Sequence, residues 1–496
     1  MKVDIPLVLF CISLAVRLVA VYLTQFDGLY GQDSFAYFDY ALALRQALAA
    51  GELPPPFFWP IGYPLLVALV SLFTGAQPLA GQLSSVLAGA AIAPLVYLLV
   101  RQYRPEAHVG GIIAGLLAAT AAQLTLSSIS VMADTTALFW ATLSAWLMAR
   151  YGQRLSARWL AAAAAAIALA TLTRWVYGLL LIPWGVAAWL AWRQAGYSRR
   201  QMAGAATTAV AIGLVLLALH SAADLARATP SYTGDLQVYS WRPANVFQKE
   251  LVNADGRFNY EYATGYFYAR PAFHPAYLFP LLAPFWLLGL WALRRQPPAL
   301  AALLVGWILI IYLFLAGVPW QNWRFPLSFF PPLLVLVGLG FDWAWQRLSP
   351  RWRPLLLATC ALALVGSAAW AVRDVGRFAA WANERKATAV TIAAALPANA
   401  TLIAFDLTAT MQHYTAVDTH EIFNLTETDL ADILAPSASS GTAVYLLLNP
   451  DNIHSQWAGK SPERNFTWLQ THAELTPITT YGSLVLYRVE SERLGD

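Results

Sequence analysis

Long apolar runs dominate the first three quarters of this chain and predict helices that cross a membrane. A helical span requires about 20 consecutive apolar residues. Such runs lie at 5–24, 79–100, 109–127, 133–149, 159–173, 175–192, 202–220, 276–293, 299–316, 326–346 and 354–371. They amount to roughly eleven spans, with an error of about one. The expected fold class is therefore an all-α polytopic membrane bundle, with its first domain over residues 1–372.

After residue 372 the pattern changes to that of a soluble domain. Short apolar runs predict strands at 401–405, 443–448 and 483–489, and helical spacing occurs at 378–396, 427–434 and 463–471. Alternation of strands and helices is typical of an α/β domain. We therefore expect a small α/β domain over residues 373–496.

Two long segments between spans stand out. The segment 25–78 holds an amphipathic stretch at 34–49, a proline run that ends it, and an apolar stretch at 65–73 that is too short to span. Both stretches predict helices in the membrane interface. The segment 221–275 is polar and rich in Tyr, Trp and Arg, and long loops in a protein of this kind are usually functional or disordered. Its aromatic content argues against disorder.

Composition and charge support the membrane assignment and give it an orientation. The chain of 496 residues is 58% hydrophobic and 12% charged, whereas soluble domains are about 25% charged. Arginines cluster in alternate short loops, following Lys2 near the N-terminus. The positive-inside rule then predicts a cytoplasmic N-terminus and an extracytoplasmic C-terminal domain. These arginines account for the net charge of +4, so no nucleic-acid partner is implied.

Four charged side chains at the predicted external surface are candidates for chemistry. Asp33 follows the first span and can act as a general base, although Asp is equally favoured as a helix N-cap. Asp134 opens a span, where acids are functional candidates by default, although it can simply start the helix. Arg174 and Arg324 lie at span ends, where arginine commonly snorkels to the surface.

The first external loop also carries a resemblance to a known family. It reads GQDSFAYFDYALALRQALAAGELPPPFFWPIGYPLLVAL and resembles that loop in the GT-C membrane glycosyltransferases, close to the dolichyl-phosphate-mannose–protein mannosyltransferases and aminoarabinose transferases. The matching positions are Asp33, Tyr37, Gly51, Pro54 to Pro56 and Tyr63 to Leu66. Some members carry two adjacent acids in this loop, whereas here Gln32 precedes Asp33. This leaves open whether Asp39 or Asp134 supplies a second carboxylate.

The resemblance implies an activity. Such enzymes move a sugar from a polyprenyl-phosphate carrier to an extracytoplasmic acceptor hydroxyl or amine, with inversion. Asp33, with Asp134, would be catalytic, and Arg174 and Arg324 would bind the donor phosphate. Further candidate contacts with substrate are Tyr37, Asp39, Trp59, Tyr63, Arg242, Lys249 and His274. If a divalent ion such as Mg²⁺ or Mn²⁺ is used, Asp33 and Asp134 are its candidate ligands.

Other classes of function stay open at this point. A transporter or flippase of lipid-linked saccharide would also have many spans, but it typically shows broken helices in matching halves and no internal repeat is visible here. A non-catalytic membrane protein that binds glycans is the second alternative, and an oligosaccharyltransferase is the third. The partners expected are membrane lipid, the lipid-phosphate donor and a glycan, lipid or protein acceptor, in a bacterial plasma membrane. The sequence does not identify the sugar or the acceptor.

Overall fold

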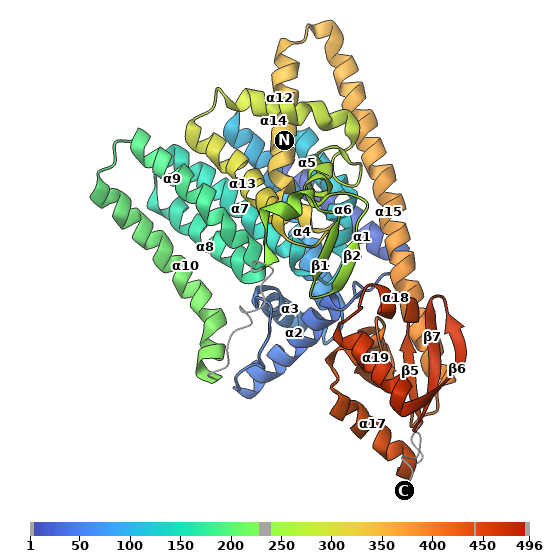
Figure 1. Cartoon of the computed structure of the whole chain (residues 1–496). Helices are drawn as coiled ribbons and strands as arrows, with labels where there is room; N and C mark the ends of the chain where they lie inside the picture. The colour runs from blue at the N-terminus through green and yellow to red at the C-terminus, as the bar shows by residue number, and fades with distance from the viewer. Residues whose placement is uncertain (1–3, 228–239, 441–442, 492–496) are drawn as a thin grey trace. The chain divides into compact units, whose positions relative to one another are not determined.

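The computed structural model describes residues 4–227, 240–440 and 443–491, and the chain divides into two units (Figure 1). The first unit contains residues 1–29, 36–247 and 264–379. The second contains residues 30–35, 248–263 and 380–496. Lys2 and residues 228–239 of the long polar segment lie outside the described residues.

The first unit is a bundle of helices. Its long helices are α1 (Ile5–Thr24), α4 (Leu79–Tyr103), α5 (His108–Thr120), α6 (Ala122–Ile129), α7 (Ala133–Arg154), α8 (Ala157–Thr173), α9 (Leu181–Gln194), α10 (Arg199–Arg227), α12 (Ala283–Leu293), α13 (Pro298–Gly317), α14 (Phe330–Arg347) and the first part of α15 (Arg353–Ala395). Short pieces connect them: η1 (Trp175–Leu180), η4 (Pro243–Phe247), α11 (Thr264–Ala269), η5 (Arg270–Phe273), η6 (Pro280–Leu282), η7 (Phe325–Phe329) and η8 (Pro350–Trp352).

Each apolar run predicted as a span falls on helix, but the count of eleven is not confirmed. Within the described residues, seven helices are long and apolar enough to cross a membrane, and the bent pair α5–α6 would make eight. The apolar helices at 157–173 and 280–293 fall short of that length. The protein is therefore an integral membrane protein whose exact number of spans stays a prediction.

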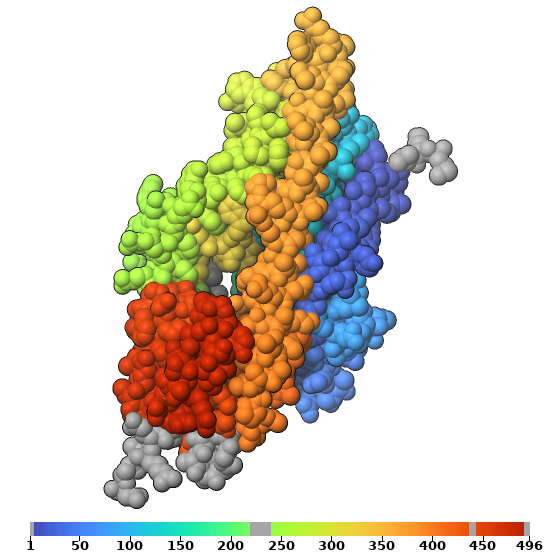
Figure 2. Space-filling model, turned by 90° about the vertical axis from the view of Figure 1, so that its right-hand side faces the viewer, coloured from blue at the N-terminus to red at the C-terminus, as the bar shows by residue number. Residues whose placement is uncertain are grey.

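The central helices of the bundle are buried, and the outer helices expose apolar side chains. The most apolar windows of α4 and of the η7–α14 segment are 72% and 94% buried, whereas those of α1 and α10 are 17% and 0% buried. α1 and the long α15 run along the outer face seen in Figure 2. Glycines let the central helices approach closely, since a Cβ on Gly110 would lie 2.2 Å from the carbonyl oxygen of Gly338. Small residues serve this purpose where helices pack in a membrane.

A buried arginine lies inside the first predicted span. Arg17 of α1 is fully buried, and its Nη1 donates to the Ser13 hydroxyl at 2.6 Å. The guanidinium also donates to the carbonyl oxygens of Ala119 and Ala118, both at 3.4 Å. These carbonyls close α5, where the chain bends by 51° into α6. Carbonyl groups at a helix end lack hydrogen-bond partners within the helix. Arg17 therefore supplies hydrogen bonds to the carbonyl groups that the bend between α5 and α6 leaves without partners.

The loop over residues 25–78 forms two helices, as predicted. They are α2 (Asp33–Ala50) and α3 (Gly62–Thr74). α3 leaves Leu69, Leu72 and Phe73 exposed by 51%, 61% and 91%. An apolar surface of this kind is typical of a helix that lies in a membrane interface, which stays a prediction for both helices.

The second unit is built on a five-stranded sheet. Its strands are β3 (Thr401–Ala404), β4 (Asp418–Glu421), β5 (Val444–Leu448), β6 (Ala473–Tyr481) and β7 (Leu484–Ser491), in the order β4-β3-β5-β7-β6. Its helices are α16 (Thr408–Tyr414), η9 (Ile422–Asn424), α17 (Glu427–Ser440), α18 (Pro450–Ser455) and α19 (Ser461–His472). β3 pairs in parallel with β4 and β5, whereas β7 pairs antiparallel with β5 and β6.

Helices cover both faces of this sheet. Ile403 and Leu446 pack with α17 and α19 on one face, and Leu402 and Leu447 pack with α15 and α16 on the other. The predicted α/β character is confirmed. The sequence missed β4 and β6, because both are polar strands without an apolar run. The predicted helix at 378–396 is not separate, since it is the last part of α15.

The long polar segment 221–275 contains a β-hairpin that the sequence analysis also missed. β1 (Glu250–Asn253) pairs antiparallel with β2 (Gly256–Asn259) across a tight turn. Gly256 has φ +104°, a conformation that favours glycine. The Asp255-Gly256 pair is a known hairpin signal, and it could have identified this element.

A partly buried carboxyl in the sheet predicts a dependence of stability on pH. Burial raises the pKa of Glu421, in β4, from 4.5 to about 7, and its Oε1 has no hydrogen-bond partner among the described residues. Between these pH values the unfolded chain loses this proton while the folded chain keeps it. Stability therefore falls as pH rises through the window, by at most about 3 kcal/mol.

We expect Glu421→Gln to unfold at a higher temperature than the wild type at pH 8, and at nearly the same temperature at pH 5. Thermal unfolding of the full-length protein at both pH values measures this difference. Glu427→Gln, at an exposed position of α17, is the control. An equal difference in unfolding temperature between variant and wild type at the two pH values would contradict the raised pKa of Glu421.

Candidate active site

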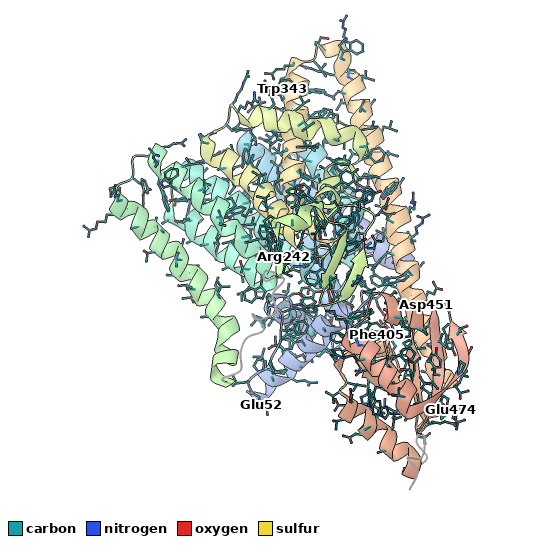
Figure 3. The ribbon with its side chains drawn as sticks, viewed as in Figure 1. Glu52, Arg242, Trp343, Phe405, Asp451 and Glu474 are labelled. Atoms are coloured by element: carbon teal, nitrogen blue, oxygen red, sulfur yellow. The ribbon has the colours of Figure 1, made fainter. Side chains whose placement is uncertain are left out.

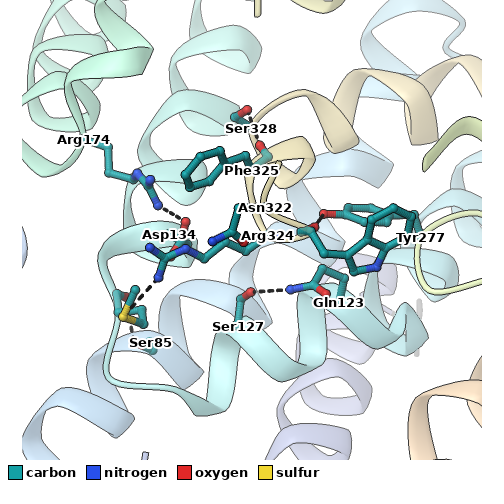
Figure 4. Close-up of polar contacts among 12 residues, drawn as sticks. Ser85, Gln123, Ser127, Asp134, Arg174, Tyr277, Asn322, Arg324, Phe325 and Ser328 are labelled. Atoms are coloured by element: carbon teal, nitrogen blue, oxygen red, sulfur yellow. Dashed lines mark hydrogen bonds and ion pairs between the residues drawn. The ribbon is translucent and has the colours of Figure 1, made fainter. Parts of the chain in front are cut away.

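The best-defined polar site in the bundle is centred on Asp134 (Figure 4). Asp134 lies in the first turn of α7, after the extended residue Met132. A carboxylate is favoured there by the partial positive charge of a helix N-terminus. It is 5% exposed and forms an ion pair with Arg174, the residue that ends α8. The second oxygen, Oδ2, is buried and has no hydrogen-bond partner among the described residues.

Two arginines lie beside the same aromatic ring near this carboxylate. The guanidinium carbons of Arg174 and Arg324 lie 5.6 Å and 5.7 Å from the ring centre of Phe325. Arg324 precedes η7, and its Nη1 contacts the sulfur of Met132 at 3.6 Å. The two basic residues predicted at the external surface thus come to one place, beside one of the two predicted acids.

The backbone before Arg324 is fixed by buried tyrosines that the sequence analysis did not single out. The Tyr268 hydroxyl donates to the carbonyl oxygen of Trp320 at 2.7 Å, and the Tyr277 hydroxyl donates to that of Trp323. Arg324 N–H donates to Asn322 Oδ1 at 3.0 Å. Both tyrosine side chains are fully buried, so the segment has little freedom.

A second set of hydrogen bonds fixes the residues that lead to Asp134. The Ser85 hydroxyl donates to the carbonyl oxygen of Met132 at 3.2 Å, and Gln82 Nε2 donates to that of Ile129 at 3.0 Å. The Tyr63 hydroxyl lies 3.0 Å from Ser85 Oγ. Tyr63 is fully buried, which favours a role in positioning over the predicted contact with substrate.

A small pocket opens beside the ion pair. The pocket lining combines the two charges with apolar and aromatic side chains, from Asp134, Arg174, Val176, Tyr177, Phe314, Leu315, Phe325, Leu327 and Ser328. Pockets of this composition, mostly apolar with a few convergent polar groups, are typical of ligand sites.

Asp33 is the first residue of α2 and belongs to the second unit. The helix therefore begins at Asp33 itself and not at the following residue. The Ser34 hydroxyl lies against the backbone of Tyr30, accepting from its N–H at 2.6 Å. Asp39, further along α2, is exposed.

The predicted aromatic contacts of the first loop form one cluster. Tyr37 stacks on Trp59, with ring centres 4.7 Å apart, and meets Tyr63 edge-on at 5.5 Å. Tyr37 is 6% exposed, whereas Trp59 is partly exposed.

Of the three candidates from the second loop, Arg242 and His274 belong to the first unit and Lys249 to the second. Arg242 is exposed, and its backbone N–H donates to Gly317 at 2.9 Å (Figure 3). Lys249 is exposed beside the hairpin of the second unit. His274 is partly buried against Trp323, with ring centres 4.7 Å apart. Burial and the nearby Arg270 lower the pKa of His274.

The described residues contain no group of three or more His, Cys, Asp or Glu side chains that could hold a metal ion. One oxygen of Asp134 is engaged by Arg174, which leaves Oδ2 for other partners.

Comparisons with known proteins agree with this architecture. The sequence model of the dolichyl-phosphate-mannose-protein mannosyltransferase family matches residues 8–231, a range that includes Asp33, Asp134 and Arg174. No curated protein matches the sequence. The structure is similar to that of ArnT from Cupriavidus metallidurans bound to undecaprenyl phosphate, with 16% identity, 97% of each chain covered and a TM-score of 0.66.

A second similar structure is the oligosaccharyltransferase of Archaeoglobus fulgidus. Sequence identity is 12%, 99% of this chain and 74% of that chain are covered, and the TM-score is 0.59. At such identities the likeness concerns the fold.

Proposed function

We propose that this chain, which belongs by its fold to the GT-C superfamily of membrane glycosyltransferases, transfers a sugar from a polyprenyl-phosphate donor to an extracytoplasmic acceptor. The observation that carries the proposal is that the guanidinium groups of Arg174 and Arg324 both lie within 5.7 Å of the Phe325 ring centre, where Arg174 pairs with Asp134. The relative whose structure holds undecaprenyl phosphate has the same fold. The family matched by residues 8–231 takes its name from a dolichyl-phosphate sugar donor.

The two arginines form a site for the donor phosphate. The two guanidinium groups lie beside the same Phe325 ring, and a phosphate between them would interact favourably with both. Arginine presents a planar set of donors that matches phosphate oxygens. In the reaction, the bond between the anomeric carbon and the phosphate oxygen breaks, and these arginines stabilise the phosphate that leaves.

Asp33 is the base in this proposal. The acceptor oxygen or nitrogen attacks the anomeric carbon from the side opposite the phosphate, which inverts that centre. Its proton passes to the Asp33 carboxylate as the new bond forms. A positioned general base of this kind contributes typically 10²- to 10⁴-fold to the rate.

Asp134 has a separate part in the proposal. Its Oδ2 is buried without a partner among the described residues, and buried polar atoms are nearly always hydrogen-bonded in working proteins. We assign Oδ2 to a hydroxyl of the bound sugar or acceptor, while Oδ1 holds Arg174 in place.

The test is an assay of sugar release by purified protein in lipid. A panel of radiolabelled polyprenyl-phosphate hexoses and pentoses is offered with hydroxyl and amine acceptors, and label that leaves the lipid is counted. Release from one donor would support the proposal and identify the sugar class. No release and no binding of any donor would refute it.

We also propose that the N-terminus is cytoplasmic and the C-terminal domain extracytoplasmic. The helix ends that carry the clustered arginines are those predicted to be cytoplasmic. There the arginines form cation–π pairs with tryptophans, as expected at a membrane surface, where tryptophan is enriched. The pairs are Arg150–Trp146, Arg193–Trp189, Arg294–Trp291, Arg347–Trp343 and Arg353–Trp345. Figure 3 labels Trp343.

We expect a reporter fused after Asp496 to be active only outside the cytoplasm. A phosphatase that requires export and a fluorescent protein that requires the cytoplasm give opposite signals for the two topologies. A fluorescent C-terminal fusion, together with an inactive phosphatase fusion, would overturn the orientation.

A further inference from the structure

The segment that carries Asp33 packs on the C-terminal domain. Residues 30–35 belong to the second unit, although they lie in the loop after the first helix of the bundle. Phe35 is 2% exposed. Its ring centre lies 5.4 Å from that of His413 and 6.0 Å from that of Tyr414, both at the end of α16.

The surface that receives Phe35 is firmly attached to the sheet. Met411, in the same helix, is fully buried between sheet and α15. Gln412 Nε2 donates to the carbonyl oxygen of Thr419 in β4 at 2.8 Å. On the outer side, the Lys386 ammonium lies 4.2 Å above the Tyr414 ring. His413 and Tyr414 therefore have defined positions.

The second external loop packs on the same domain. Arg257 N–H donates to the carbonyl oxygen of Gln456 at 2.7 Å, and Gln456 Nε2 donates back to the carbonyl oxygen of Asp255 at 2.9 Å. A Cβ on Gly256 would lie 2.2 Å from the Gln456 carbonyl oxygen. The C-terminal domain thus holds parts of both long external loops.

We propose that the C-terminal domain positions the catalytic base, and that His413 and Tyr414 are the positioning residues. This inference rests on the proposed function, since it takes Asp33 to be the base. Asp33 and Phe35 share the first turn of α2, so anchoring the Phe35 ring fixes the direction in which the Asp33 carboxylate points. A misplacement of about 1 Å at a reacting group can cost on the order of 100-fold in rate.

The experiment compares Tyr414→Ala and His413→Ala with Tyr414→Phe, which keeps the ring. His472→Ala is the matched control, because His472 also stacks on an aromatic ring of this domain, that of Trp468 at 4.3 Å. Two properties of the full-length protein in lipid are measured. They are hydrogen exchange of the amides in residues 30–35, and kcat and KM for the polyprenyl-phosphate sugar that the donor panel identifies.

We expect the two alanine variants to exchange faster at residues 30–35 and to lose on the order of 10- to 100-fold in kcat, with an unchanged KM. Tyr414→Phe and His472→Ala should match the wild type. The kcat is expressed per molecule that binds donor, because a variant that merely weakened the fold would lose folded protein and would then keep the wild-type kcat per folded molecule.

Asp33→Asn separates failure of this inference from failure of the proposed function. Wild-type turnover by Asp33→Asn would refute Asp33 as the base, whatever the Tyr414 variants do. Loss of turnover in Asp33→Asn, together with wild-type kcat and wild-type exchange in Tyr414→Ala and His413→Ala, would refute only the positioning role.

Discussion

Replacing Asp33 with asparagine is expected to abolish sugar transfer while the donor still binds. Asparagine has nearly the same shape as aspartate but cannot accept a proton at neutral pH. The expected loss in kcat is about 10²- to 10⁴-fold, the usual contribution of a general base. Because the proposed phosphate site consists of Arg174 and Arg324, the dissociation constant of the donor should change little.

Single-turnover release of labelled sugar gives the chemical rate, and equilibrium binding of the labelled donor gives affinity. Glu52→Gln is a suitable control, because Glu52 is an exposed acid just beyond the end of the same helix (Figure 3). If Asp33→Asn turns over at the wild-type rate, the proton must go elsewhere and the assignment is wrong.

Replacing Arg324 or Arg174 with alanine is expected to weaken donor binding. Hydrogen bonds to charged groups contribute about 1.5–3 kcal/mol each, which corresponds to roughly 10- to 150-fold in affinity. The two variants should differ in stability. Arg174→Ala also leaves the buried Asp134 carboxylate without its ion-pair partner, and breaking a buried pair can cost about 3–5 kcal/mol.

Adding Asp134→Asn to Arg174→Ala should therefore restore much of the lost stability without restoring donor affinity. Binding of the labelled donor and thermal unfolding in lipid measure the two effects separately. Arg347→Ala is the control, because this arginine stacks on Trp343 away from the Asp134 pocket. If both Arg324→Ala and Arg174→Ala bind the donor with wild-type affinity, the proposal that these arginines bind the donor phosphate is refuted.

The sequence by itself determined the membrane character and most helices of this protein. In a bilayer, backbone polar groups must be satisfied within the segment, so a long apolar run leaves helix as nearly the only outcome. In the C-terminal domain, short apolar runs located the strands β3, β5 and β7, which fill the core of the sheet. The sequence also singled out Asp33, Asp134, Arg174 and Arg324 as individual candidates.

Only the tertiary structure decided which of these residues meet. Asp134 and Arg174 are 40 residues apart in sequence, and Arg324 contacts Met132 across 192 residues. No local pattern encodes such contacts, because they depend on how the helices pack. The supporting roles of Tyr268, Tyr277 and Ser85 were hidden for the same reason.

The packing of the Asp33 segment on the C-terminal domain was also beyond the sequence. Phe35 reads as one apolar position of an amphipathic helix, and nothing nearby in the chain identifies its partners, which follow nearly 380 residues later in α16. Local periodicity determines that such a side chain will be buried. The tertiary fold determines which surface buries it, because that choice depends on the free energy of packing distant segments together.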